Sequence, residues 1–91
     1  MYYVLFYDFV DDILNLRTPY RAEHIARAKA AYDEGFLVMA GAFNPPEGSA
    51  MVFRADDRAQ VEEFANNDPY VANGLVPDWK IREWTVVIPS E

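Results

Sequence analysis

The sequence predicts an α+β domain whose elements run in the order β-α-β-β-α-β. Three observations lead to this fold class. A chain of 91 residues suits one hydrophobic core rather than two. Segments rich in aromatic and β-branched residues lie at its start, middle and end, as strands would. An alanine-rich segment and a segment with a helix-capping signal separate them.

The first third of the chain predicts a strand and a long helix. Residues 2–7 are aromatic and β-branched, which is typical of a strand, and residues 8–17 indicate a loop or a short turn. Thr18-Pro19 predicts the start of a helix, with the threonine hydroxyl as N-cap and proline at the first helical position. We expect this helix to run to Glu34 and to end at Gly35.

A hairpin is expected next. Residues 36–43 and 49–55 have the composition of strands, and Asn44-Pro45-Pro46-Glu47-Gly48 lies between them. Two prolines and a glycine cannot continue a ladder of backbone hydrogen bonds, so this segment predicts a turn.

The last third predicts a second helix and a final strand. Asp57-x-x-Gln60 resembles a capping box, with Val61 and Phe64 on one face of the helix that follows. A short helical turn is expected over residues 70–75, and a strand over residues 79–88. The order is that of a ferredoxin-like sandwich, in which two helices pack on one face of a four-stranded antiparallel sheet. We expect one such domain over residues 1–91.

The strands are apolar on both of their faces, which indicates self-association. An antiparallel sheet with one wet face alternates apolar and polar residues. Phe36-Leu37-Val38-Met39-Ala40 is apolar throughout, and Trp84-Thr85-Val86-Val87-Ile88 and the first strand are nearly so. Two helices cover only one face, so the pattern predicts a homodimer that pairs through its sheets. The alternative is a partly exposed apolar sheet.

Composition excludes several classes of function. With 15 acidic and 8 basic residues the net charge is -7, and no basic cluster offsets it, so we expect no nucleic-acid partner. The absence of cysteine excludes disulfides and thiolate chemistry and fits a cytoplasmic protein. No segment approaches the roughly 20 apolar residues that span a bilayer. Residues 1–8 also lack the basic leader and cleavage site of a signal peptide.

His24 is the one histidine and the side chain best suited to moving protons near neutral pH. Helical spacing places it on an inward face, with Arg27 on the opposite face. The alternative is a histidine at the edge of the core that hydrogen-bonds a backbone carbonyl. The other residues predicted on the inward face are Tyr20, Arg21, Ile25, Ala28, Ala31 and Tyr32.

Asp68 is the carboxylate best placed to be its partner. It follows the second helix on a turn fixed by Pro69, and both helices are expected on the same side of the sheet. There it could accept a hydrogen bond from the imidazole of His24 and set the tautomer of the ring. An aspartate before proline is also a common turn residue, which is the alternative.

Other chemistries have less support. One histidine and no cysteine do not predict a zinc site, and no glycine-rich phosphate-binding motif occurs, so we expect neither metal nor cofactor. Ser49 and Ser90 lack the surroundings of a nucleophilic serine. Four tyrosines could line a pocket or belong to the core: Tyr3, Tyr7, Tyr32 and Tyr70.

Several of these residues form motifs that resemble the YCII-related (YciI-like) family. The resemblance extends from the first strand to the last. Its motifs are Met1-Tyr2-Tyr3-Val4, Arg21-x-x-His24-x-x-Arg27, Ala40-Gly41 and Asp68-Pro69-Tyr70-Val71-x-x-Gly74.

This resemblance implies a ferredoxin-like fold that dimerises as an α+β barrel, and an active site made by His24 and Asp68. Arg21 matches a recurrent arginine of the family, one helical turn before the histidine. We expect Arg21, Tyr3, Gly41 and Tyr70 to contact the substrate. The chain departs from the family over residues 41–46, where the loop is short and alanine occupies position 42 in place of a frequent proline. In the family that loop usually helps to shape the pocket, so the resemblance does not define the substrate.

Two functions are compatible with the sequence. The first is a cofactor-independent lyase or isomerase that acts on a small cyclic or aromatic-derived metabolite, with His24 and Asp68 as an acid–base dyad. The second is a non-catalytic dimeric module that binds a small ligand or regulates an enzyme. In that case His24 and Asp68 are a structural pair between the two helices.

Overall fold

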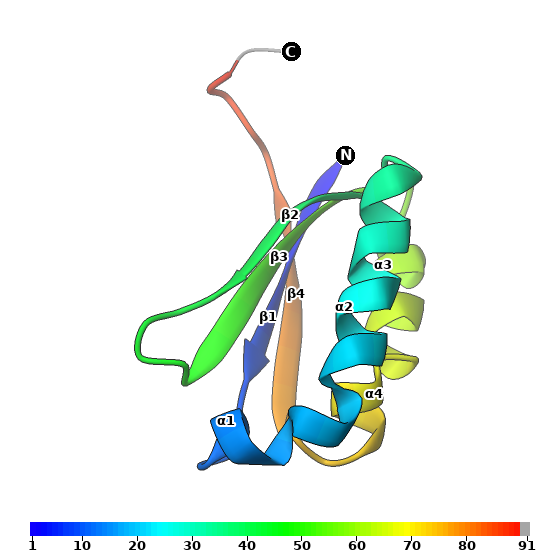
Figure 1. Ribbon diagram of the computed structural model, residues 1–91. Coiled ribbons are helices and arrows are strands. Elements are labelled where there is room, and N and C mark those ends of the chain that lie inside the picture. Colours follow the sequence, from blue (N-terminus) through cyan, green and yellow to red (C-terminus); the bar gives the residue numbers. More distant parts are fainter. Residues whose placement is uncertain (90–91) are drawn as a thin grey trace.

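The main helices lie on one face of an antiparallel sheet, as the computed structural model shows for residues 1–89 (Figure 1). The four strands follow one another across the sheet in the order β2-β3-β1-β4. The elements are β1 (Tyr2–Asp8), α1 (Ile13–Leu16), α2 (Thr18–Asp33), β2 (Leu37–Ala42), β3 (Gly48–Arg54), α3 (Arg58–Asn66), α4 (Pro69–Ala72) and β4 (Asp78–Trp84). With α1 and α4 as short additions, this order confirms the ferredoxin-like α+β fold that the sequence predicts.

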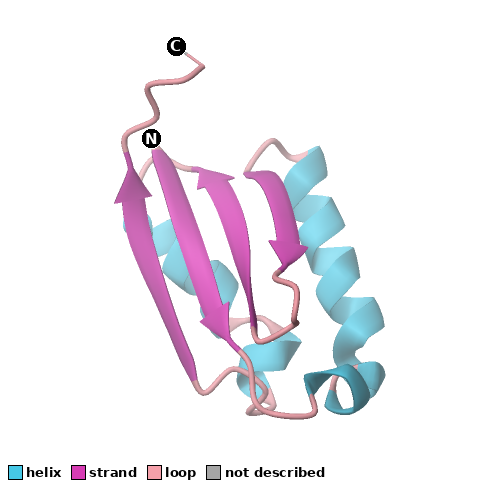
Figure 2. Cartoon of the chain, turned by 90° about the vertical axis from the view of Figure 1, so that its left-hand side faces the viewer, coloured by secondary structure: helices cyan, strands magenta, loops and turns pink. Residues whose placement is uncertain are grey.

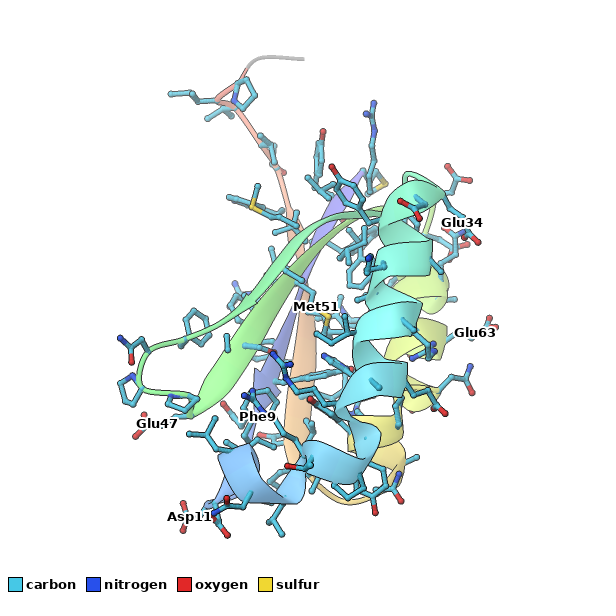
Figure 3. The ribbon with its side chains drawn as sticks, viewed as in Figure 1. Phe9, Asp11, Glu34, Glu47, Met51 and Glu63 are labelled. Carbon is cyan, nitrogen blue, oxygen red and sulfur yellow. The ribbon has the colours of Figure 1, made fainter. Side chains whose placement is uncertain are left out.

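The core lies between the sheet and the helices. Leu5, Met51 and Phe53 of the two central strands are buried, and from α3 Val61 and Phe64 face them, as predicted. The rings of Phe53 and Phe64 are 5.0 Å apart. Figure 3 shows Met51 between the sheet and the helices. This packing fixes the helix layer against the sheet.

Local signals define most helix ends. The predicted capping box is present, because the Asp57 carboxylate accepts a hydrogen bond from the Gln60 backbone and the Gln60 side chain accepts one from the Asp57 backbone. Gly35, which follows α2, adopts a φ of 81°, a conformation that glycine takes without strain.

The predicted N-cap at Thr18 is wrong. Thr18 is already helical, and Arg17 before it has helical dihedral angles and donates its backbone N–H to the Ile13 carbonyl oxygen at 2.9 Å. The cause is α1, which leads almost directly into α2. A threonine caps a helix only where the chain enters from an extended conformation.

The inward face of α2 also differs from the prediction. Arg21, Ile25 and Tyr32 are exposed, whereas Arg27 is half-buried and its guanidinium lies 4.6 Å from the centre of the Phe64 ring. The helix is rich in alanine, so its apolar residues do not define a single face. His24 lies on the inward side, as predicted, and is half-buried.

The last strand is shorter than predicted. β4 ends at Trp84, which pairs with Tyr2, the first residue of β1. Residues beyond Trp84 have no strand of the described chain beside them, so the β-forming sequence there makes no ladder. Val87 and Ile88 are 72% and 87% exposed, and this segment leads away from the sheet (Figure 1).

No helix covers the second face of the sheet, which faces the viewer in Figure 2. We call it the open face. On β1 and β3 it presents pairs such as Val4 and Val52, and Met39 of β2 lies opposite Val52. The outward positions of β4 carry Lys80, Arg82 and Trp84, and the rest of the apolar segment from which self-association was predicted, residues 85–88, lies beyond the strand. The centre of the open face is therefore apolar over β1, β2 and β3, with basic residues beside it on β4.

Gly48 is the glycine with the tightest surroundings. A Cβ built there would collide with the backbone carbonyl oxygen of Tyr7, whereas a Cβ at Gly41 would have nothing within 4 Å. We expect Gly48→Ala to lower the free energy of unfolding by about 3 kcal/mol, the upper end of overpacking costs. Gly41→Ala, on the same hairpin, should change it little. Urea unfolding of both variants measures this, and equal stability would contradict it.

Candidate functional site

Asp68 is a fully buried carboxylate that three donors hold in place. It is the N-cap of α4, with Pro69 at the first helical position, and its Oδ1 accepts the backbone N–H of Tyr70 at 2.9 Å. The Tyr7 hydroxyl of β1 donates to Oδ2 at 2.8 Å. Nδ1 of His24 lies 3.0 Å from both carboxylate oxygens. The structure therefore brings together the two residues of the predicted dyad, 44 positions apart in the chain.

The other ring nitrogen of His24 reaches solvent. The side chain is 17% exposed, and Nε2 has no hydrogen-bond partner among the described residues. Within the same residues, no buried side-chain nitrogen or oxygen lacks a partner, so Nε2 is not buried. The ring stacks on Tyr70, with centroids 3.9 Å apart and planes 8° from parallel. Asp68 and Tyr70 thus fix the ring and leave Nε2 free to act on a ligand.

The surroundings keep Asp68 ionised. Burial by itself would raise the pKa of this carboxyl, but the hydrogen bond and charge of His24, the Tyr70 N–H and the Tyr7 hydroxyl together hold it below the ordinary 3.8. Burial and the adjacent Asp68 charge raise the pKa of Tyr7, so its hydroxyl remains a donor across the neutral range. A stable carboxylate is what an imidazole needs beside Nδ1 in order to carry a second proton.

Two arginines give this acidic chain positive charge near the dyad. Burial raises the pKa of the Tyr70 phenol, and the charges of Arg17 and Arg21 act in the opposite direction. Both arginines therefore lie within electrostatic reach of the ring that stacks on His24. Arg21 is exposed and Arg17 is half-buried. This charge can attract a carboxylate or a phenolate.

Two predicted substrate contacts lie away from the dyad. Tyr3 is buried at the opposite end of β1 from Tyr7, which is about 14 Å along a strand. Its hydroxyl lies 3.9 Å from the sulfur of Met1. Gly41 pairs with Ala50, whose side chain is on the open face. Within one copy of the chain, only Arg21 and Tyr70 of the four predicted contacts lie near His24.

Sequence reasoning missed Arg17 and Phe9 and left Tyr7 open between a pocket and the core. Tyr7 holds Asp68, Arg17 adds charge, and Phe9 packs edge-on against both Tyr7 and Tyr70, with centroids 6.3 Å apart in each pair. Figure 3 shows Phe9 just past the end of β1. Tyr7 had a signal, because strand alternation places it on the same face as Tyr3 and Leu5.

A hollow of about 830 Å³ lies elsewhere, at the far end of the helices. Its lining includes Arg27, Glu34 and Gln60 but neither His24 nor Asp68. No group of three or more potential metal ligands occurs among the described residues. In the same part of the chain, no helix is long and apolar enough to cross a membrane.

Comparison with known sequences gives the family. The profile of the YCII-related domain matches residues 1–85. The chain belongs to the YCII-related domain family. An uncharacterized protein of Haemophilus influenzae is 32% identical over 88 residues, which cover 86% of this chain and 90% of the relative. Protein YciI of Escherichia coli O6:H1 is 32% identical over 85 residues, which cover 82% and 87%. The predicted family is therefore confirmed.

Solved structures support the fold of this YCII-related protein. The 5-chloro-2-hydroxyhydroquinone dehydrochlorinase TftG of Burkholderia phenoliruptrix AC1100, in complex with 2,5-dihydroxybenzoquinone, superposes with a TM-score of 0.83 and 18% identity over 100% of both chains. An antibiotic biosynthesis monooxygenase gives a TM-score of 0.55 with 14% identity, over 96% of this chain and 99% of that one. At these identities the likeness concerns the fold alone.

Proposed function

We propose that this protein is a cofactor-independent lyase or isomerase for small cyclic or aromatic-derived metabolites, with His24 and Asp68 as its acid–base dyad. The contact of His24 Nδ1 with both oxygens of a buried carboxylate, combined with a solvent-accessible Nε2, carries the proposal. This is the arrangement of a histidine whose tautomer and orientation are fixed for proton transfer.

The proposed proton transfer follows from the hydrogen bonds. Asp68 accepts Nδ1–H, so the lone pair of neutral His24 lies on Nε2. Nε2 takes a proton from the substrate, and the electron pair of the broken bond forms a new double bond. In an elimination, the leaving group departs with its own electron pair. In an isomerisation, the imidazolium returns the proton to another atom. Asp68 stabilises the imidazolium in either case.

The substrate class rests on the lining of the site and on one comparison. Phe9, which is half-buried and packs on Tyr70, offers aromatic surface near the imidazole, and Arg17 and Arg21 offer positive charge for a phenolate or carboxylate. TftG, which shares the fold, is a dehydrochlorinase of a chlorinated hydroxyhydroquinone. These features favour a hydroxylated ring as substrate. Of the predicted contacts the proposal keeps Arg21, whereas Tyr70, which is buried, serves to orient the His24 ring.

Proton exchange tests the chemistry before the natural substrate is known. Incubation with a panel of hydroxylated and chlorinated ring compounds in D₂O should show deuterium incorporation or product formation by NMR. His24→Ala should abolish it. If His24→Ala leaves turnover of every active compound unchanged, His24 is not the acid–base group.

One observation favours the non-catalytic alternative. Asp68 is fully buried and bonds to β1, α2 and α4 together, as a purely structural carboxylate would. In that case loss of the His24 side chain would leave the buried Asp68 carboxylate with fewer donors. The free energy of unfolding would then fall by about 1–3 kcal/mol. The partial exposure of the imidazole favours the enzyme instead.

We further propose that two copies pair through the open face of the sheet. Its apolar centre includes Val4, Phe6, Met39 and Val52, none of which any helix covers. A second copy of the chain would cover these residues with its own open face, so the same residues would be buried in both copies. Symmetric dimers form in this way. The basic positions on β4 would lie toward the edge of such an interface.

Val52→Asp should prevent this pairing. The variant brings a carboxylate from each copy into the centre of the interface, and its desolvation should raise the dimer dissociation constant by at least about 100-fold. Ala22→Asp, on the exposed side of α2, adds the same charge and should leave the dimer intact. Sedimentation velocity measures both. A monomeric wild-type chain, or a dimeric Val52→Asp variant, would contradict the proposal.

A further inference from the structure

The hydroxyl of Ser49 has no partner among the described residues although the residue is almost fully buried. Ser49 lies on β3 and is 8% exposed, and its Oγ makes no hydrogen bond to any described residue. Because no buried side-chain oxygen among those residues lacks a partner, Oγ must reach solvent. Ser49 therefore has a hydroxyl without an internal partner that contacts solvent at an otherwise buried position.

The pairing of the strands places Ser49 beside the dyad. It lies directly opposite Tyr7 on one side and Ala42 on the other, so all three share the face that the helices cover. The Cβ atoms of such opposite residues are about 5 Å apart. Tyr7 in turn donates its hydroxyl to Asp68, which contacts His24. One side chain thus separates Ser49 from the buried carboxylate.

The sheet next to Ser49 is uncovered. Ala40 and Ala42 of β2 lie opposite Met51 and Ser49, so their side chains point to the helix side, yet both are exposed. Leu37, at the start of the same strand, is buried. The helix layer therefore covers β2 at Leu37 but not at Ala40 and Ala42. Small side chains at these two positions leave room for a flat molecule against the sheet.

We propose that Ser49 is a substrate-binding residue, whose hydroxyl hydrogen-bonds an oxygen substituent of a ring that lies over Ala40 and Ala42. This inference rests on the proposed function, which supplies the ring class. It adds that the ring must carry a hydroxyl or keto oxygen at the position that faces Ser49. The aromatic surface and His24 would then lie on the opposite side of the same ligand.

The unfolding midpoint of Ser49→Ala is the first test, and it requires no ligand. If the hydroxyl serves a ligand, its removal from the free protein breaks no internal hydrogen bond, so the midpoint should stay the same or rise. Thr18→Ala, which removes an exposed hydroxyl from the first turn of α2, is the matched control. A clear fall for Ser49→Ala alone would show that the hydroxyl has a structural partner and would overturn the inference.

Ligand binding is the second test, with 2,5-dihydroxybenzoquinone as the probe. Calorimetric titration should show binding to the wild-type chain and to Thr18→Ala, and binding about 3- to 10-fold weaker to Ser49→Ala, as expected for one hydrogen bond. Unsubstituted benzoquinone, which has two oxygens fewer, should discriminate less between the variants. Equal probe affinities for wild type and Ser49→Ala, or no binding to the wild type, would overturn the inference.

His24 variants separate this inference from the proposed function. If Ser49→Ala weakens binding but His24→Ala keeps turnover, the ligand site stands and the dyad mechanism fails. If His24→Ala abolishes turnover while Ser49→Ala binds the probe as the wild type does, the mechanism stands and the Ser49 contact fails. A crystal soaked with the probe should show a ring oxygen about 2.6–3.2 Å from Oγ.

Discussion

Replacing His24 with asparagine should lower kcat/KM by about 10²–10⁴-fold, the usual contribution of one positioned acid–base group. Asparagine can still donate a hydrogen bond to Asp68, so the buried carboxylate keeps all three of its donors. It has no basic nitrogen where Nε2 lies, so it cannot take the substrate proton. Steady-state kinetics on any compound that the wild type turns over measures the loss.

Ile25→Ala is the matched control, because Ile25 is the next residue of α2 and its side chain is exposed. It should retain wild-type kcat/KM. Added imidazole should restore part of the activity to a His24→Gly variant, where the missing ring leaves space. Wild-type activity in His24→Asn would exclude proton transfer at Nε2.

The thermal stability of the same variants decides between enzyme and binding module. A structural pair predicts that His24→Ala lowers the unfolding midpoint clearly while His24→Asn, which keeps the hydrogen bond, lowers it less. A catalytic histidine in an accessible site predicts a small change or a gain in stability for both. The two functions thus differ in a measurement that requires no substrate.

Local signals in the sequence predicted the features that depend on local structure. The capping box at Asp57 depends on four consecutive residues, and Gly35 ends α2 through its own backbone conformation. The pairing of His24 with Asp68 is not local, but topology decides it, because both helices must cover the same face of the sheet. That pairing could therefore be predicted from the order of the elements.

Features that depend on which neighbour is present could not be predicted. The last strand stops at Trp84 because β1 begins at Tyr2, and the composition of residues 85–88 carries no trace of that limit. The alanine-rich sequence of α2 does not define which face of the helix turns inward. Arg21, predicted to face inward, is exposed, and Arg27, predicted to face outward, is half-buried. Tyr3 and Tyr7 occupy equivalent positions on one strand face, and only the location of α4 selects Tyr7 as the partner of Asp68.

Asp68→Ala should be the most destabilising change at the site. It removes the carboxylate that accepts hydrogen bonds from Tyr7, Tyr70 and His24. Two of these donors, the Tyr7 hydroxyl and the Tyr70 backbone N–H, are buried. We expect the free energy of unfolding to fall by about 3–5 kcal/mol, as when one member of a buried pair is lost. Asp33→Ala, which removes an exposed carboxylate from α2, should change it little. Urea unfolding near neutral pH measures both variants.

The pH dependence of the stability lost in Asp68→Ala shows whether the charge of the carboxylate is the cause. The pKa of Asp68 is lower in the folded chain than the ordinary 3.8, so the folded state holds the carboxylate more strongly than the unfolded state does. Its contribution to stability is therefore complete above the unfolded pKa and is lost as the pH falls through the folded one. The stability difference between wild type and Asp68→Ala should be constant near neutrality and should shrink progressively below about pH 4. A difference that stays constant or grows on acidification would mean that the charge of Asp68 is not what its three donors stabilise. The same carboxylate then could not support an imidazolium at His24.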